Sequence, residues 1–119
     1  MEKQKIDAVV PAPFLNYRQI VNYLDEQYAN EITSQDIEAK LQKNYGYLCQ
    51  IFKKYSGTTI HSYIQQLRVQ RAKYLLLSSN KEINEISYEV GCQDPYYFSR
   101  LFKKWEGVSP LVYRTQKRV

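Results

Sequence analysis

The chain has 119 residues, a net charge of +5 and a hydrophobic fraction of 44%. This length fits one domain, or two small domains that share a helix, and the hydrophobic fraction is sufficient for a buried core. No apolar segment is long enough for a signal peptide or a membrane span. Two cysteines that lie far apart, without C-x-x-C spacing, indicate a reduced, intracellular protein.

Positive charge is concentrated after the first third of the chain. Residues 1–40 hold four Lys or Arg and seven Asp or Glu, a net charge of −3, whereas residues 41–119 hold thirteen and five, a net charge of +8. This asymmetry favours a polyanionic partner. The alternative is a solvated basic surface without a specific partner.

The first predicted helix follows an irregular tail. Residues 1–13, which contain Pro11 and Pro13, are expected to be a linker or tail and indicate a fragment of a longer protein. Residues 16–29 then place apolar side chains at helical spacing, which predicts a helix with one buried stripe.

Capping residues predict the next two helices. Thr33 begins a capping sequence for a short helix that carries Ile37 and Leu41. Asn44 is placed to cap the following helix, which Gly57 ends because glycine adopts the left-handed conformation easily.

The remaining elements are also predicted to be helices. The longest covers about residues 58–78, and another runs from about residue 82 to 91. Asp94-Pro95 and Ser109-Pro110 each combine an N-cap with a proline at the first helical position, so each begins a further helix. No alternating pattern of useful length predicts a strand, and the chain is therefore expected to be all-α. The inward stripes are formed by Tyr17, Ile20, Val21, Leu24, Tyr28, Leu48, Ile51, Phe52, Tyr55, Ile60, Tyr63, Ile64, Leu67, Ala72, Leu75, Leu76, Phe98, Leu101, Phe102, Trp105 and Tyr113.

The most informative feature is an internal repeat. The segments Tyr47-Leu48, Ile51-Phe52-Lys53-Lys54-Tyr55 and Gly57 recur fifty residues later as Tyr97-Phe98, Leu101-Phe102-Lys103-Lys104-Trp105 and Gly107. Upstream the offset is forty-nine, so the second copy carries one extra residue between its helices. Each copy is a short helix, a tight turn and a second helix, which is a helix-turn-helix unit. Two copies are too few for a solenoid, so the duplication indicates a target with a repeat of its own.

One long segment resembles a known signature. Residues 86–104, ISYEVGCQDPYYFSRLFKK, followed by Gly107, Ser109-Pro110 and Tyr113-Arg114, resemble the AraC/XylS family. The upstream segment is similar to the family's first motif and connecting helix, so the resemblance covers residues 16–114; its matching positions are Leu48, Phe52-Lys53-Lys54, Gly57-Thr58, Tyr63-Ile64, Arg68, Ala72 and Leu75-Leu76.

The resemblance implies a seven-helix transcription-regulator domain with two helix-turn-helix subdomains. The first subdomain is expected at residues 14–57, the long connecting helix at 58–79, and the second subdomain at 80–117. The chain departs from the family at two places. Glu38, Gln42 and Lys43 replace small residues around the first turn, and Cys92 replaces a phenylalanine; we expect a different geometry at the first turn and less apolar volume after Gly91.

The duplication suits double-stranded DNA. Successive major grooves on one face lie about 34 to 36 Å apart, and a connecting helix of about twenty residues is about 30 Å long. The expected target is asymmetric because the two copies carry different side chains. The side chains left outward by the core, together with the family resemblance, predict base contacts from Tyr45, Gly46, Cys49, Gln50, Tyr96, Ser99 and Arg100. Phosphate contacts are predicted for Lys53, Lys54, Thr58, Lys103, Lys104 and Ser109.

Other functions have less support in the sequence. His61 is the only histidine and has no metal-ligand or general-base partner by spacing, so we expect no enzyme, metal or cofactor. Tyrosines that stack on single-stranded bases are a minor alternative, for which Tyr45, Tyr96, Tyr47 and Tyr97 are candidates. A helical adaptor for a protein partner is the main rival, but it would not need paired lysines in both copies.

The sequence therefore predicts the output domain of a bacterial, cytoplasmic transcription regulator. Its expected partners are double-stranded DNA, RNA polymerase and a sensory domain on the same full-length chain.

Overall fold

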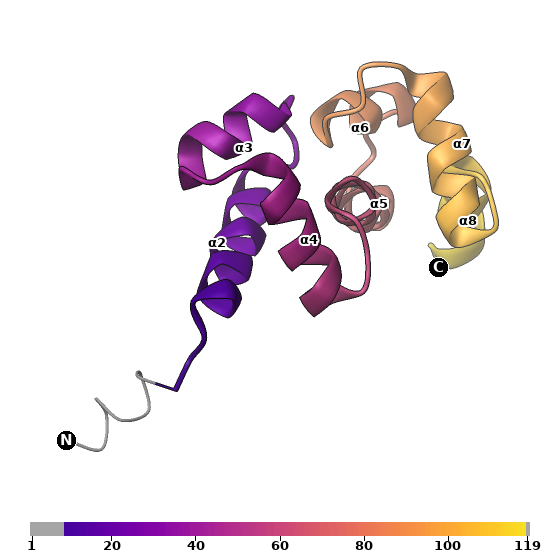
Figure 1. Cartoon of the computed structure of the whole chain (residues 1–119). Helices are drawn as coiled ribbons and strands as arrows, with labels where there is room; N and C mark the ends of the chain where they lie inside the picture. The colour runs from indigo at the N-terminus through magenta and orange to yellow at the C-terminus, as the bar shows by residue number, and fades with distance from the viewer. Residues whose placement is uncertain (1–8, 119) are drawn as a thin grey trace. The chain divides into compact units, whose positions relative to one another are not determined.

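The computed structural model describes residues 9–118, which form seven α-helices and no strand (Figure 1). The all-α prediction and the number of helices are confirmed. The helices are α2 Ala12–Gln27, α3 Ser34–Leu41, α4 Tyr45–Ser56, α5 Ile60–Ser78, α6 Ile83–Glu89, α7 Pro95–Glu106 and α8 Pro110–Lys117. Within the described residues, no helix has both the length and the apolar character needed to cross a membrane.

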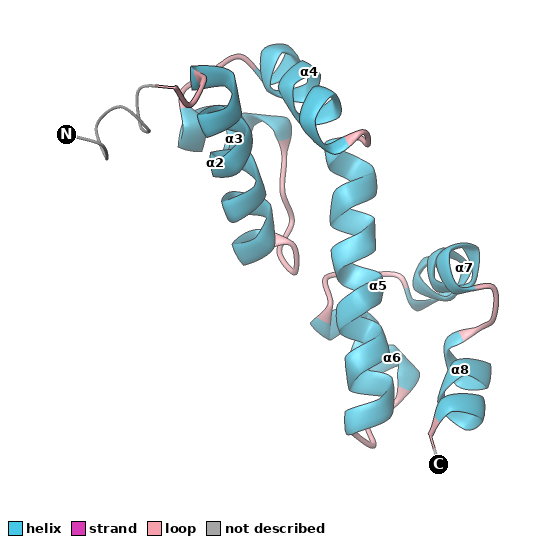
Figure 2. Cartoon of the chain, turned by 90° about the horizontal axis from the view of Figure 1, so that it is seen from below, coloured by secondary structure: helices cyan, strands magenta, loops and turns pink. Residues whose placement is uncertain are grey.

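The chain divides into two compact units. Of the described residues, the first unit contains 9–27 and 32–62, and the second contains 28–31 and 63–118. Helix α5 is continuous and contributes its first turn to the first unit and the rest to the second (Figure 2). Each unit therefore contains a short helix followed by a second helix, α3 and α4 in the first and α6 and α7 in the second.

The first helix begins earlier than the apolar pattern predicts. The Pro11 carbonyl accepts a hydrogen bond from the backbone N–H of Leu15 at 3.2 Å, and α2 starts at Ala12, not at Asn16. Pro13 is accommodated in the first turn because an N–H there has no partner within the helix. The predicted tail, residues 1–13, lies largely outside the described residues.

The predicted caps of the other helices are confirmed. The Thr33 hydroxyl accepts from the Asp36 N–H, and the Asp36 carboxylate accepts from the Thr33 N–H, both at 3.0 Å. These bonds, the one from the Thr33 backbone first, hold the pKa of Asp36 below its usual range. The side chains of Asn44, Asp94 and Ser109 cap α4, α7 and α8 as expected.

The core of the first unit is rich in aromatic rings. Phe52 is fully buried, and the ring of Tyr17 lies 5.6 Å from it between centroids. The Tyr55 ring contacts both Tyr17 and Phe14, each at 5.4 Å. The buried residues of this unit are Ile20, Leu24, Ile37, Leu48, Ile51, Phe52 and Ile60.

The core of the second unit is mainly aliphatic, and two predictions fail there. Val69 is only 2% exposed although the predicted inward stripe of α5 omits it, and Trp105 is 37% exposed although the pattern predicts that it faces inward. Gln66 of α5 aligns with Tyr17 of α2 and is exposed, so an amide stands where the first unit supplies a ring. The core consists of Val69, Ala72, Leu75, Leu76, Ile86, Val90, Cys92, Phe98, Leu101 and Phe102.

Two arginines hold the ends of helices. Arg68 donates from Nε to the Tyr28 carbonyl at 2.8 Å and from Nη2 to the Asn30 carbonyl at 3.2 Å. Arg114 donates in the same way to the Leu76 and Ser79 carbonyls, at 2.9 and 3.2 Å. Carbonyl groups at and beyond the last turn of a helix lack intrahelical partners, so both guanidinium groups have a structural role.

Candidate nucleic-acid interface

Helices α4 and α7 present matching faces to solvent. The buried face of α4 is formed by Leu48, Ile51 and Phe52, and the equivalent face of α7 by Phe98, Leu101 and Phe102. On the opposite face the exposed residues are Gly46, Gln50 and Lys53 in α4 and Tyr96, Arg100 and Lys103 in α7. Each exposed residue of α4 is thus matched, fifty positions later, by one of α7.

The predicted base-reading residues divide into two groups. Gly46, Gln50, Tyr96 and Arg100 are exposed, and the Tyr96 side chain is 79% exposed. Tyr45, Cys49 and Ser99 are half-buried at the edge of the exposed face. Burial, together with the neighbouring Cys49, raises the pKa of Tyr45 above its ordinary value.

Four lysines continue the exposed faces toward the C-terminal ends of both helices. Lys53, Lys54, Lys103 and Lys104 are all exposed. The ion pairs of the described residues, Lys73–Glu106 and Lys81–Glu89, do not involve them. These ammonium groups therefore have the exposure that phosphate contacts require.

The other two predicted phosphate contacts lie where α5 and α8 begin. The Thr58 N–H donates to the Ser56 hydroxyl at 3.1 Å, and the Ser109 hydroxyl accepts from the Val112 N–H at 3.2 Å. Both groups therefore already serve to cap or close a turn.

The turn between α3 and α4 contains or contacts two residues that depart from the family pattern, and they help to position α4. Glu38 accepts a hydrogen bond from the backbone N–H of Tyr45 at 2.7 Å, which satisfies a donor at the start of α4. Gln42 has a φ of 54°, the only positive φ of a residue other than glycine in the described part of the chain. In the second unit Gly91 occupies the aligned position with a φ of 98°.

One side-chain hydrogen bond recurs in both units and involves residues outside the predicted site. It joins α4 to α2 in the first unit and α7 to α5 in the second. The Asn16 amide donates from Nδ2 to the Tyr47 hydroxyl at 3.3 Å, and the Gln65 amide donates from Nε2 to the Tyr97 hydroxyl at 2.9 Å. The sequence pattern gives these tyrosines as members of the repeat and as candidates for base stacking, and predicts no role for the amides. Asn16 and Gln65 are separated by forty-nine residues, the upstream offset of the repeat, and this alignment was the available signal.

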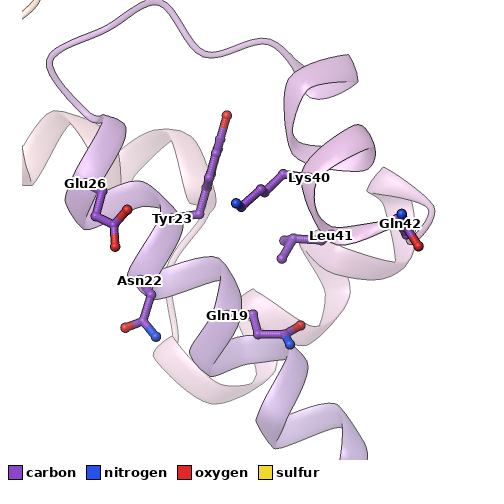
Figure 3. Close-up of a pocket in the computed structure, with 7 residues that line it drawn as sticks. All are labelled: Gln19, Asn22, Tyr23, Glu26, Lys40, Leu41 and Gln42. Carbon is purple, nitrogen blue, oxygen red and sulfur yellow. The ribbon is translucent and has the colours of Figure 1, made fainter.

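A hollow of about 360 Å³ lies between α2 and α3 in the first unit (Figure 3). Its lining is mainly polar and contains none of the predicted site residues: Gln19, Asn22, Tyr23, Glu26, Lys40, Leu41 and Gln42. Both cysteines are free thiols, and residues 9–118 contain no group of three His, Cys, Asp or Glu side chains placed to hold a metal ion.

The fold and this surface define the class of helix-turn-helix proteins, here with two units in one chain. The family model of the helix-turn-helix domain matches residues 37–116. The uncharacterized HTH-type transcriptional regulator YisR of Bacillus subtilis is 38% identical over 92 residues, which cover 77% of this chain and 32% of that protein.

Solved structures agree with the sequence match. The C-terminal domain of AraT, a response regulator from Geobacillus stearothermophilus, has a TM-score of 0.84 and 30% identity, with 87% of each chain covered. A transcriptional regulator with an AraC-type DNA-binding domain from Chromobacterium violaceum has a TM-score of 0.78 and 25% identity, covering 85% of this chain and 90% of that one. The chain belongs to the AraC family of helix-turn-helix transcription regulators and comprises the DNA-binding domain. It spans about a third of the length of the first curated relatives it matches, 32% of YisR.

Proposed function

We propose that this chain recognises an asymmetric duplex site by placing α4 and α7 in two successive major grooves. The observation that carries the proposal is the pair of matched exposed faces, which share their lysines but differ in the residues between them. Gln50 in α4 aligns with Arg100 in α7; a Gln amide suits a bidentate contact to adenine, and a guanidinium suits one to guanine.

The proposed division of labour follows from exposure and charge. Gly46, Gln50, Tyr96 and Arg100 face the bases, with Tyr45, Cys49 and Ser99 at the edge of the same surface. The four lysines neutralise phosphates. Thr58 and Ser109, at the starts of α5 and α8, also contact phosphates of the DNA backbone. Helix α5 has nineteen residues and, at about 1.5 Å per residue, a length of about 28 Å, which supports the two-groove arrangement.

The rest of the regulator is also part of the proposal. Residues 14–57 and 80–117 act as the two reading subdomains, with residues 58–79 between them. Because the chain spans only about a third of several relatives, a sensory domain on the same full-length chain is expected to control it. The regulator acts in the cytoplasm, where it meets DNA and RNA polymerase.

The salt dependence of binding tests this mode. The affinity for duplexes selected from a random pool should fall with salt, and the slope of log affinity against log salt should be about −0.9 for each phosphate contacted. With about four to eight contacts, the slope should lie between about −4 and −7. The double variant Lys53→Glu/Lys103→Glu should weaken all duplexes together.

The control is Arg18→Glu, which makes at an exposed position of α2 the same change of charge as either lysine substitution alone. It should have a much smaller effect. Binding that is nearly independent of salt, or a chain that binds no duplex and instead retains a protein partner, would contradict the proposal and favour a helical adaptor.

A further inference from the structure

Tyr47 and Tyr97 occupy the same place in the two second helices. Each is the third residue of its helix, and their exposed fractions are 39% and 37%. Each hydroxyl accepts a hydrogen bond from a side-chain amide of α2 or α5, the helix that precedes the short helix of its unit.

The two amides come from different residue types. Asn16 reaches Tyr47, and the longer Gln65 reaches Tyr97. The contact therefore recurs although the side chain that makes it differs between the copies. A general need to pack the helices would not require a polar contact at this position in both units, so the recurrence points to a role for the phenol itself.

The hydrogen bond from the amide orients the hydroxyl group of the phenol, which can still donate its own hydrogen. A phenolic oxygen that accepts from an amide still has its own hydrogen to donate. The amide restricts the position of the oxygen, and more than a third of each tyrosine remains exposed. Each unit thus presents one oriented, neutral O–H donor beside its second helix.

The neighbours of these tyrosines indicate what the donor meets. Tyr47 lies two helical turns before Lys54, and Tyr97 lies two turns before Lys104, so each pair shares one edge of its helix. This edge is between the core face and the face that carries Gln50 or Arg100. When a helix enters the major groove, its outermost face meets the bases and its edges meet the sugar-phosphate walls.

We propose that Tyr47 and Tyr97 each donate their hydroxyl hydrogen to a phosphate oxygen of the DNA backbone, with Asn16 and Gln65 as positioning residues. This inference rests on the proposed function, because it assumes that α4 and α7 enter the groove. It assigns two phosphate contacts that carry no charge, beside the four that the lysines make.

The test replaces each tyrosine by phenylalanine in the whole chain. Tyr47→Phe and Tyr97→Phe should each weaken binding to selected and unrelated duplexes alike, by about tenfold, as expected for a hydrogen bond to a charged group. The slope of log affinity against log salt should not change, because a neutral phenol releases no counterion. The matched control is Tyr74→Phe, an exposed tyrosine on α5 whose ring stacks on Arg71.

The positioning role has its own test. Gln65→Leu should weaken binding in the parent chain but should add little in the Tyr97→Phe background, because the amide acts through the phenol. Asn16→Leu should behave in the same way with Tyr47→Phe. A purely structural contact would instead lower the melting temperature and leave the affinity of the folded fraction unchanged.

The outcomes separate this inference from the proposed function. If Arg100→Ala alters base preference while both phenylalanine variants bind like the parent, the phosphate contact is wrong and the two-groove mode stands. If a phenylalanine variant changes the preferred bases, the phenol reads a base and the inference is also wrong. If the parent binds no duplex, the proposed function fails first.

Discussion

The two helix-turn-helix units use the same backbone conformation at their turns for different reasons. Gln42 and Gly91 are aligned, and both have a positive φ, 54° and 98°. At Gly91 a Cβ would lie 2.7 Å from the Ala29 carbonyl oxygen, so the second turn excludes any side chain. Gln42 is exposed and carries its side chain at the cost of an unfavourable conformation. At position 91 glycine is required because a side chain would clash. At position 42 glycine would be favoured only because of the positive φ.

The cores differ in a similar way around a shared centre. Phe52 and Phe102 align and are both fully buried. The Tyr17 ring of α2 contacts Phe52, whereas α5 contributes aliphatic side chains to the core that contains Phe102. The rings near Phe102 come from Phe98 and Tyr113, at 6.1 and 5.4 Å. The repeat therefore preserves the central ring and the exposed face of each second helix, while the surrounding core varies.

The largest expected effect comes from removing the buried phenylalanine ring at the centre of each core. Phe102→Ala and Phe52→Ala should each lower the free energy of unfolding by about 3 to 5 kcal/mol, because each leaves a cavity in a fully buried site. Urea unfolding followed by circular dichroism measures both losses. Because a small domain has only about 5 to 15 kcal/mol of stability, a variant that melts within a degree or two of the parent would show that its phenylalanine is not central.

A methyl group at Gly91 tests the spatial demand of the second turn. Gly91→Ala should cost about 3 kcal/mol, because it combines the left-handed conformation with a clash against backbone that cannot rotate away. Gly107→Ala is the matched control: its φ is 86°, but nothing lies within 4 Å of the added Cβ, so it should cost only about 1 kcal/mol. Equal losses in thermal unfolding would mean that Ala29 moves aside freely.

The two units should also read separate parts of one DNA site. Arg100→Ala should lose about 1 to 3 kcal/mol of discrimination at one or two base pairs, and Gln50→Ala should do so in the other half of the site. The affected positions should be about 10 base pairs apart. Footprints of both variants on a selected site measure this. Changes at the same base pairs, or protection by one unit alone, would disprove the two-groove model, and the atypical first turn is where such a failure should appear.

The smallest effect tests the conformational demand of the first turn. Gln42→Gly should raise the free energy of unfolding by about 1 kcal/mol, since glycine adopts a positive φ without steric cost. Lys43→Gly is the control: the neighbouring residue has no positive φ, so glycine there should destabilise the chain slightly. If both variants lose stability to the same extent, the side chain of Gln42 contributes more than its conformation costs.

Most local structure followed from short-range chemistry. The caps at Thr33, Asn44, Asp94 and Ser109 were predicted because each acts on N–H groups within three residues of itself. The start of α2 was missed because Pro11 and Pro13 suggested a linker, although proline is well tolerated in a first turn. The base and phosphate contacts stay predictions.

By itself, the sequence determined the all-α class, the two helix-turn-helix units, the family and the exposed faces of α4 and α7. The class, the units and the exposed faces depend on periodicity and on a repeat, and the family depends on the motif residues that resemble its signature; all of these are properties of the chain alone. Only the tertiary structure decided that Trp105 is partly exposed, that Arg68 and Arg114 hold helix ends, and that Asn16 and Gln65 reach the two tyrosines. Each depends on atoms about thirty to forty residues apart in the sequence, or on the shape of the neighbouring helix, and no local pattern encodes those distances.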